Sequence, residues 1–326
     1  MLISRTPLRL SIGGGGTDLP SYYRHQSALV ISAAINRYCY IAVNRTFVDD
    51  YFVKYSELER ARTIEELRHP IIREALRLQQ VGPGIEIASM ADIPSGTGLG
   101  SSGTFTVGLL CALHAIQRHH VSAQQLAEEA CHLEIEVLRQ PVGKQDQYIA
   151  AYGGLTCFEF HPDESVDVTP LAIPEAALHQ LEEHLLLFFT GYSRSASSIL
   201  DDQNNRSKAG DRSILDSLEF TAELGKRIRT SLEAGDCAAF AHLMNDHWQY
   251  KRERSPGMSN SSIDECYRIA LDNGARGGKL VGAGAGGFLL FYADDPPALR
   301  AAMAAKGLGE TRFGFDFDGS TVLARG

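Results

Sequence analysis

The feature that most constrains the fold is a glycine- and serine-rich run between a predicted strand and an apolar helix. The run PSGTGLGSSGT occupies residues 94–104, after the alternating segment 84–90 and before the apolar stretch 105–116. Glycine lets the backbone take positive φ and approach a ligand closely. Free N–H groups and the dipole at the start of the helix favour an anion. The run therefore predicts a phosphate-binding loop, in which the hydroxyls of Ser101 and Ser102 can hold a phosphate oxygen or Mg²⁺.

Two familiar phosphate loops differ from this run. A Walker A loop has a lysine after its glycines, and this run has none. Gly98, Gly100 and Gly103 match the pattern G-x-G-x-x-G, but a dinucleotide site also needs an acidic residue about 20 positions on, at the end of a second strand. Here that region is a predicted helix containing Glu128 and Glu129. A nicotinamide-dependent oxidoreductase and a glycine turn without a ligand stay open as alternatives.

Bulk properties narrow the class of protein. The chain has 326 residues, 44% of them hydrophobic, and a formal net charge of −9. It contains no Lys/Arg cluster that would bind nucleic acid. Its six cysteines lack metal-site spacing, which indicates reduced thiols in a cytoplasmic protein. The apolar runs are too short to span a bilayer, so no membrane partner is expected.

Strands and helices are mixed without strict alternation, which favours an α+β fold over a doubly wound sheet. Strands are predicted at 2–12, 29–47, 84–90, 153–160 and 184–190, near 288 and at the C-terminal end, and helices at 70–80, 105–116, 123–139, 210–232, 236–250, 260–273 and 296–305. The acidic, proline-bearing segment near residue 162 is the best candidate for a linker. We therefore expect two domains, 1–165 and 166–326.

Three motifs in order carry a resemblance to a known family. The run 94–102 is similar to the phosphate loop of the GHMP kinases. Residues 6–9 (TPLR) with 13–18 resemble the N-terminal motif of that family, and 281–288 (VGAGAGGF) resembles its C-terminal glycine loop. Within the family, the phrases LRLSIGGGGTDLPSYY, GKQDQY and GGKLVGAGAGGF are most similar to bacterial D-glycero-D-manno-heptose 7-phosphate kinases.

The resemblance implies a fold and an activity. It implies an N-terminal domain like domain 2 of ribosomal protein S5 and a ferredoxin-like C-terminal domain. It also implies transfer of the γ-phosphoryl group of ATP, with Mg²⁺, to the anomeric hydroxyl of the heptose 7-phosphate, in nucleotide-heptose synthesis for capsule or lipopolysaccharide. Another GHMP sugar kinase (for fucose, a uronic acid or galactose) and a non-catalytic sensor of ATP and sugar stay open, as does a homo-oligomer.

The resemblance also assigns catalytic roles. Asp146 would accept the proton of the substrate hydroxyl. Arg9 would neutralise the transferred phosphoryl group. Lys144 would either keep Asp146 ionised or bind a substrate phosphate. The contacts to the phosphates of ATP are assigned to Pro94, Gly96, Gly98, Leu99, Gly100, Ser101, Ser102, Gly103 and Thr104.

Metal and sugar ligands follow from the same comparison. Ser101 and Glu134 would hold Mg²⁺, and Glu134 is preferred to Glu136 because it falls within the apolar face of its helix. The sugar is expected to contact Gly15, Gly16, Thr17, Asp18, Gly284, Gly286 and Arg194. Cations for a substrate phosphate are sought in the polar stretch 190–208, at Arg194, Arg206 and Lys208.

Overall fold

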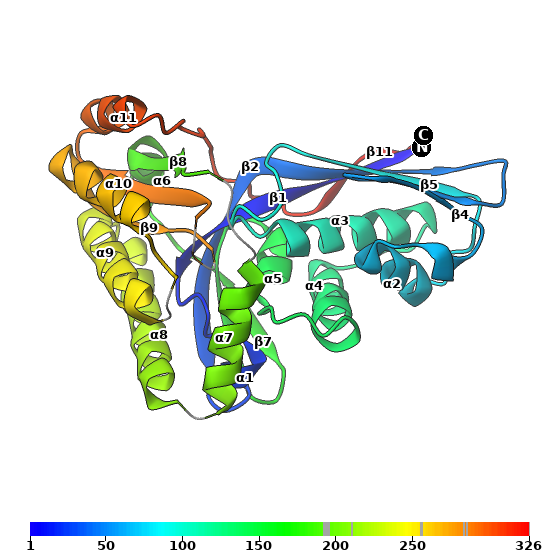
Figure 1. The fold of residues 1–326 in the computed structure, drawn as a ribbon, viewed down its shortest axis with the longest axis horizontal. Coiled ribbons are helices and arrows are strands. Elements are labelled where there is room, and N and C mark those ends of the chain that lie inside the picture. Colours follow the sequence, from blue (N-terminus) through cyan, green and yellow to red (C-terminus); the bar gives the residue numbers. More distant parts are fainter. Residues whose placement is uncertain (192–195, 210, 255–256, 283, 285, 326) are drawn as a thin grey trace.

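The structure is a computed structural model, and it describes residues 1–191, 196–209, 211–254, 257–282, 284 and 286–325. The described residues form an eight-stranded sheet and a three-stranded sheet, both packed against helices (Figure 1). The two sheets belong to different halves of the molecule, and the longest strands of the larger sheet reach its centre. Among the described helices, none is long and apolar enough to cross a membrane.

Two long antiparallel strands form the frame of the larger sheet. β1 (Leu2–Gly13) pairs with β2 (Ala28–Arg45) over nearly its whole length. β2 also pairs with β6 (Leu155–Phe160) near its start and with β5 (Ile85–Ala91) near its end. The first eight residues of β2 are all buried and mostly Val, Ile, Leu and Ala, as expected of a strand covered on both faces.

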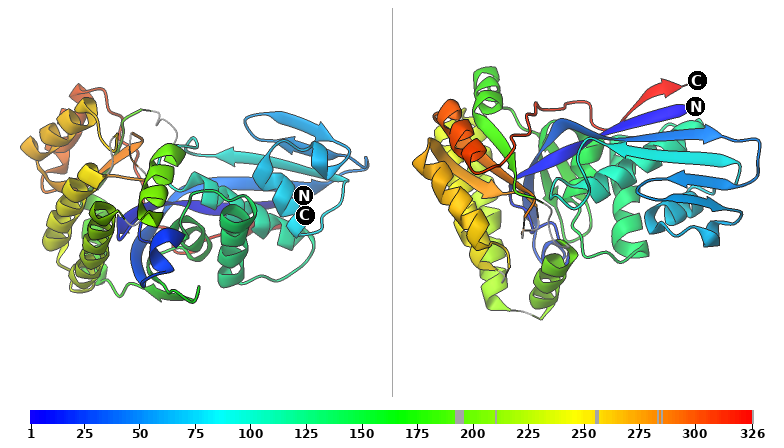
Figure 2. Two further views of the ribbon diagram at one scale, coloured as in Figure 1. Left: turned by 60° about the horizontal axis from the view of Figure 1, so that its bottom comes forward. Right: turned by 45° about the horizontal axis from the view of Figure 1, so that its top comes forward.

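The remaining strands of this sheet are short. They are β3 (Tyr51–Lys54) and β4 (Leu58–Ala61) beyond β5, β7 (Val166–Pro170) beside β6, and β11 (Thr321–Arg325) beside β1. Because β11 pairs with β1, the two ends of the chain lie side by side (Figure 2).

Helices cover this sheet in the N-terminal half of the chain (Figure 1). They are α1 (Pro20–Tyr23), the 3₁₀ turn η1 (Ile64–Glu66), α2 (Pro70–Leu78), α3 (Ser101–Ile116), α4 (Ala123–Cys131), the π-helical turn η2 (His132–Val137) and α5 (Gln145–Tyr152). α3 packs against β1, β2 and α5 and is buried along most of its length, because nearly all its residues are apolar or small. Its N-terminus lies beside α5, near the middle of the molecule (Figure 1).

The smaller sheet has the order β8-β10-β9 and is antiparallel throughout. Its strands are β8 (Leu185–Phe189), β9 (Ala275–Leu280) and β10 (Phe288–Ala293). The helices of this half are α6 (Glu175–His184), α7 (Ala196–Lys208), α8 (Arg212–Glu233), α9 (Cys237–Arg254), α10 (Ser261–Asp272) and α11 (Pro296–Ala305). α8 and α9 pack against each other, α8 also contacts β1 and β2, and α9 contacts β9.

One hydrophobic cluster joins the two halves. Leu10 and Ile31 from the long strands pack in the same buried cluster as Ile228 of α8, Phe240 of α9 and Leu290 of β10. The clusters on either side of it are more local, one beneath the larger sheet and one between the smaller sheet and α10 and α11. Burial of apolar surface across the junction fixes the position of the C-terminal half against β1 and β2.

Several elements differ from their prediction. α3 begins at Ser101, four residues before the predicted start, because the serines and Gly103 join its first turn. β3, β4 and α5 were not predicted from the sequence. The segment expected to be a linker contains β7, which forms a hairpin with β6. The domain boundary at residue 165 thus falls at the start of this strand, and the division into 1–165 and 166–326 remains a proposal.

The hydrophobic cluster that joins the two halves predicts where shortening a side chain should destabilise the fold most. Leu10 has no exposed surface, so Leu10→Ala should lower the free energy of unfolding by about 3 kcal/mol, the usual cost of a buried Leu-to-Ala change. Urea unfolding followed by circular dichroism measures this. The matched control is Leu58→Ala, because Leu58 lies on a strand but is 76% exposed, and it should change the free energy by well under about 1 kcal/mol. Equal losses in both variants would contradict the shared core.

Candidate active site

The predicted phosphate loop, the start of α5 and the C-terminal glycine loop meet at the junction of the two halves. Gly100 caps α3 in the left-handed region, with φ of 77°, and Gly96 and Gly98 also have positive φ. Only glycine takes this backbone conformation without strain. The loop therefore delivers the first free N–H groups of α3 to the centre of the molecule, as the sequence predicted.

Close packing explains the glycines at two points of the loop. A Cβ atom on Gly103 would lie 2.8 Å from Cβ of Asp146, and one on Gly98 would lie 2.5 Å from the carbonyl oxygen of Val281. Real Cβ atoms essentially never come this close to other heavy atoms. The phosphate loop is thus held between α5 on one side and the C-terminal glycine loop on the other.

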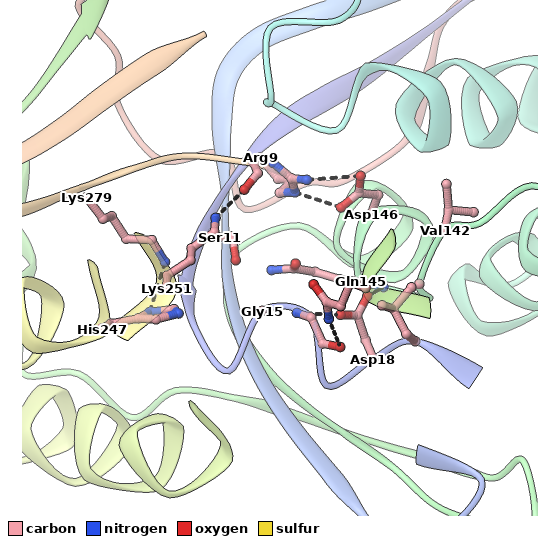
Figure 3. Close-up of a pocket in the computed structure, with 15 residues that line it drawn as sticks. Arg9, Ser11, Gly15, Asp18, Val142, Gln145, Asp146, His247, Lys251 and Lys279 are labelled. Atoms are coloured by element: carbon pink, nitrogen blue, oxygen red, sulfur yellow. Dashed lines mark hydrogen bonds and ion pairs between the residues drawn. The ribbon is translucent and has the colours of Figure 1, made fainter. Parts of the chain in front are cut away.

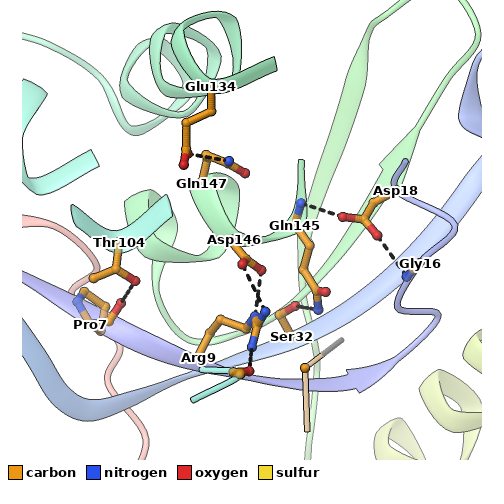
Figure 4. A network of polar contacts seen from close by, with 12 residues as sticks. Pro7, Arg9, Gly16, Asp18, Ser32, Thr104, Glu134, Gln145, Asp146 and Gln147 are labelled. Atoms are coloured by element: carbon orange, nitrogen blue, oxygen red, sulfur yellow. Dashed lines mark hydrogen bonds and ion pairs between the residues drawn. The ribbon is translucent and has the colours of Figure 1, made fainter. Parts of the chain in front are cut away.

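Arg9 and Asp146 form a bidentate ion pair beside this loop (Figures 3 and 4). Nε of Arg9 donates to Oδ1 of Asp146 at 2.7 Å, and an Nη donates to Oδ2 at 3.0 Å. The other Nη donates to the carbonyl oxygen of Gly98. The backbone N–H of Arg9 donates to the carbonyl oxygen of Leu99, at 3.0 Å. The structure therefore brings together the predicted base, the predicted arginine and the phosphate loop. Arg9 is buried, whereas the Asp146 side chain keeps 28% of its surface exposed toward a pocket.

Glu134 forms a second acidic site behind the loop (Figure 4). Its carboxylate has no exposed surface and accepts hydrogen bonds from Ser102 Oγ and, at 2.7 Å, from Gln147 Nε2. Burial raises the pKa of Glu134 to about 7, and these hydrogen bonds only partly offset it. Glu136 instead points outward and pairs with Arg24, at 2.8 Å. The apolar-face argument therefore selected the inward glutamate.

The serine that meets Glu134 is Ser102, not Ser101. Helix phase is the reason, because α3 already begins at Ser101 and consecutive side chains on a helix point in different directions. Ser101 Oγ is buried and has no hydrogen-bond partner among the described residues. A hydroxyl, a carboxylate and a nearby unsatisfied hydroxyl are hard oxygen donors that suit Mg²⁺, which takes few protein ligands beside phosphates and water. The described residues contain no group of three or more His, Cys, Asp or Glu that could hold a metal by themselves.

Asp18 closes the far side of the pocket. Its two oxygens accept N–H bonds from Gly16 and Gln145, both at 3.0 Å, and burial raises the pKa of the carboxyl group. Gly15 and Gly16 line the pocket with it, as predicted. Thr17 does not line it, because its side chain is fully buried and donates to the carbonyl oxygen of Gly14.

Lys144 is not directed at Asp146. Its Nζ pairs with Glu164 at 2.5 Å and lies 4.5 Å from the centre of the Tyr23 ring. Residues two apart on a helix do not face the same way, and Lys144 immediately precedes α5. The predicted interaction of Lys144 with Asp146 is therefore replaced by the ion pair with Glu164, through which Lys144 supports the start of α5.

Other predicted contacts fall in several places. Pro94 and Gly96 are exposed at the start of the phosphate loop, while Leu99 and Thr104 are buried, Thr104 donating to the carbonyl oxygen of Pro7. Gly284 packs on Met258, and Gly286 lines a separate cavity beside Thr190 and Asn260. Arg194 lies outside the described residues. Arg206 pairs with Asp211 and Asp202, and the side chain of Lys208 is also outside the described part.

The C-terminal glycine loop was expected to form the second wall of the site, and Gly282 of that loop does line the pocket. Sequence reasoning missed the other residues of this wall, which are Gln203, His247, Lys251 and Lys279 (Figure 3). Two local signals were present: His247 and Lys251 are four residues apart on α9, and Lys279 lies two residues before the C-terminal glycine loop. Neither signal shows which side of the helix or strand faces the phosphate loop, because that depends on tertiary packing.

Two family descriptions match this chain. "GHMP kinases N terminal domain" matches residues 64–154, and "GHMP kinases C terminal" matches residues 228–308. Together the matches cover more than half of the chain and include the phosphate loop, the start of α5 and α9 with the C-terminal glycine loop.

Individual proteins are similar over nearly the whole chain. A D-glycero-alpha-D-manno-heptose 7-phosphate kinase of Campylobacter jejuni is 29% identical over an alignment of 306 residues, and the match covers 89% of each chain. A crystal structure of a D-glycero-D-manno-heptose 1-phosphate kinase from Bacteroides thetaiotaomicron aligns with a TM-score of 0.82 at 23% identity, over 100% of this chain and 99% of that one. A galactokinase of Lactococcus lactis in complex with galactose aligns with a TM-score of 0.78 at 15% identity, over 98% and 94%. These likenesses confirm the predicted two-domain α+β fold.

The raised pKa of Glu134 predicts a pH-dependent stability. A carboxyl group whose pKa rises from 4.5 to about 7 on folding favours the folded state while it is protonated, below pH 4.5. Its contribution is lost as pH rises toward 7, by on the order of 3 kcal/mol. Glu134→Gln cannot ionise, so the free energy of unfolding of the wild type relative to this variant should fall between pH 4.5 and 7. Denaturant unfolding in a chelator, without nucleotide, measures it.

The matched control is Glu136→Gln, which lies two residues away and removes an exposed carboxylate. Its free energy of unfolding should follow that of the wild type across the same pH range. A difference between the wild type and Glu134→Gln that does not change with pH would contradict the raised pKa.

Proposed function

The chain belongs to the GHMP kinase family and is an ATP-dependent sugar kinase, and we propose that its acceptor is D-glycero-D-manno-heptose 7-phosphate. In this proposal the γ-phosphoryl group goes to the anomeric hydroxyl and the product is the 1,7-bisphosphate, used in nucleotide-heptose synthesis. The observation that carries it is a pocket lined on one side by Asp146, Asp18 and Gln145, which suit sugar hydroxyls, and on the other side by two lysines. Arg9 links Asp146 to the phosphate loop, because its guanidinium binds both Asp146 and the Gly98 carbonyl. The 29% identity with the heptose 7-phosphate kinase of Campylobacter jejuni over 89% of both chains supports the choice of sugar.

The phosphate loop would hold the triphosphate of ATP. Backbone N–H groups at the start of α3 donate to phosphate oxygens, and the helix dipole favours their negative charge. The orphaned hydroxyl of Ser101 lies in this first turn and would gain an acceptor there. Positioning of this kind accounts for most of the catalysis in phosphoryl transfer.

Asp146 would take the proton of the acceptor hydroxyl. As the hydroxyl oxygen bonds to the γ-phosphorus, the bond from that phosphorus to the β–γ bridging oxygen breaks and ADP leaves with the electron pair. The hydroxyl proton passes to the Asp146 carboxylate, which is held in place by the hydrogen bonds that two nitrogens of Arg9 donate to it. The guanidinium of Arg9 also lies beside the phosphate loop, where its charge opposes the build-up of negative charge on the transferred group.

Mg²⁺ would be held by Ser102 and Glu134 together with phosphate oxygens. A metal held there would neutralise phosphate charge. The chain's own contribution is to keep the two ligands in contact before anything binds, through the hydrogen bond of Ser102 to Glu134 and that of Gln147 to the other carboxylate oxygen. Gln147 thus orients the glutamate from behind.

A substrate panel with the Asp146→Asn variant tests the activity. Wild-type protein with Mg-ATP should convert the heptose 7-phosphate to a bisphosphate, detected by mass spectrometry. Asp146→Asn should lower kcat by about 10²- to 10⁴-fold, because the amide cannot accept the proton, while ATP binding by calorimetry persists. Asp167→Asn is the control, since that carboxylate is exposed on β7 and should leave kcat unchanged.

The panel also separates the alternatives. Turnover of fucose, a uronic acid or galactose in preference to the heptose 7-phosphate would replace the proposed substrate while leaving a sugar kinase. Binding of ATP and a sugar without transfer to any acceptor would indicate a sensor and contradict catalysis by Asp146.

The two serines of the phosphate loop should differ in their effect on metal use. Ser102→Ala should raise the Mg²⁺ concentration for half-maximal activity by about 10-fold or more, because it removes the hydroxyl that meets Glu134. Ser101→Ala should leave that concentration within about twofold and raise KM for ATP instead. Initial rates over a Mg²⁺ titration at saturating sugar measure both. The reverse pattern would return the metal to the site predicted from the sequence.

A further inference from the structure

Three basic side chains line the pocket opposite Asp146 and Asp18. They are His247 and Lys251 of α9 and Lys279 of β9, and they retain only 1%, 8% and 1% of their surface exposed. Figure 3 shows them together on the side of the pocket formed by the C-terminal half. Lys, above all, is almost never this buried in a folded protein, so two such lysines beside one pocket need a reason.

Contacts with three elements hold these groups in place. Nζ of Lys279 lies 3.1 Å from Nδ1 of His247 and donates to the carbonyl oxygen of Ile12, at 3.5 Å. Nζ of Lys251 donates to the carbonyl oxygen of Gly282. The lysine stems are packed in the protein, so the two ammonium groups are presented at fixed points of the wall and lose little side-chain entropy on binding a ligand.

The two sides of the pocket therefore differ in charge. The N-terminal side carries Asp18 and the ion pair of Asp146 with Arg9, and its carboxylates suit hydroxyls, because carboxylates accept hydrogen bonds from them. Its C-terminal side carries two ammonium groups and an imidazole, which are donors suited to an anion. A ligand that fits both sides has hydroxyls at one end and a dianion at the other.

We propose that Lys251, Lys279 and His247 bind the phosphate of a sugar-phosphate acceptor and thereby select phosphorylated over unphosphorylated sugars. The inference rests on the proposed function, since it places the reacting hydroxyl beside Asp146 and the phosphate of the same sugar across the pocket. Charge-assisted hydrogen bonds from two lysines to one phosphate are strong enough to dominate the choice of acceptor.

ATP is the other source of phosphate near this wall. Lys251 is bonded to Gly282, and Gly282 packs against Gly98 of the phosphate loop. Lys279, on the same wall, instead contacts the carbonyl oxygen of Ile12 near the end of β1. We assign both lysines to the phosphate of the acceptor sugar. Kinetics with ATP as the varied substrate distinguishes binding of the acceptor phosphate from binding of an ATP phosphate.

The test compares two acceptors in two variants. Lys251→Met and Lys279→Met keep the apolar stem and remove the charge. With D-glycero-D-manno-heptose 7-phosphate, each should lower kcat/KM by about 10- to 100-fold, the loss expected for a hydrogen bond to a charged group. With the same heptose lacking the phosphate, each should change kcat/KM by less than about threefold, and KM for ATP should stay the same. Lys226→Met, on the exposed side of α8, is the control and should match the wild type with both acceptors.

Three results would overturn the inference: equal losses with both acceptors, a raised KM for ATP with an unchanged acceptor preference, or no loss in either variant. If a variant fails to fold by circular dichroism, inorganic phosphate serves with the wild type. It should then inhibit competitively against the sugar phosphate and not against ATP, and the opposite pattern would overturn the inference.

Failure of the proposed function looks different. A wild type that prefers another phosphorylated sugar removes the heptose but leaves the variants to be compared on that sugar. A wild type with the same kcat/KM for phosphorylated and unphosphorylated acceptors would overturn the proposed role of the two lysines, whichever sugar it uses.

Discussion

The site depends on the ion pair between Arg9 and Asp146. Arg9 comes from the middle of β1, Asp146 from the first turn of α5, and the same guanidinium also binds the Gly98 carbonyl of the phosphate loop. Three segments that are far apart in the sequence are thus fixed by one buried side chain. An arginine cannot lose its proton in a protein, so it needs a compensating carboxylate, and the bidentate geometry leaves that carboxylate one orientation. The same contact that stabilises the fold therefore aims the proposed base.

Carboxyl groups around the pocket are set to different charges by their surroundings. Glu134 and Asp18 are buried, and burial raises the pKa of each, that of Glu134 to about 7. Glu164 is also penalised by burial, but hydrogen bonds from Lys144, Arg24 and Tyr23 outweigh it and lower its pKa to about 2. An approaching cation would favour ionised Glu134, so metal and proton compete for this group. Lys144 pairs with this Glu164 at the start of α5.

The sequence allowed us to predict features that depend on neighbouring residues. It did not allow us to predict features that depend on the packing of distant segments. The phosphate loop and the inward direction of Glu134 follow from glycine conformation, helix N-termini and the apolar face of one helix. The sequence did not show that Ser102, and not Ser101, contacts Glu134, because this depends on the residue at which α3 begins, and boundaries are the least certain part of any such prediction. Lys279 was missed because a lysine in a strand is usually a solvated edge residue, and only the packing of β9 on α9, and of α9 on β1, places it at the pocket.

The division of labour in the pocket follows from how the two halves are joined. The long strands β1 and β2 carry Arg9, Ser11 and the loop with Asp18, and they also supply part of the apolar cluster that holds α8 and α9. Because both halves share that cluster, the wall with Lys251 and Lys279 is held against β1 and β2, as the phosphate loop is. The two lysines themselves lie outside the phosphate loop. A change of acceptor can therefore be made by substitution on α9 and β9 while the groups that handle ATP stay in contact through Gly98 and Gly282. Similar folds with different sugar acceptors are what such an arrangement permits.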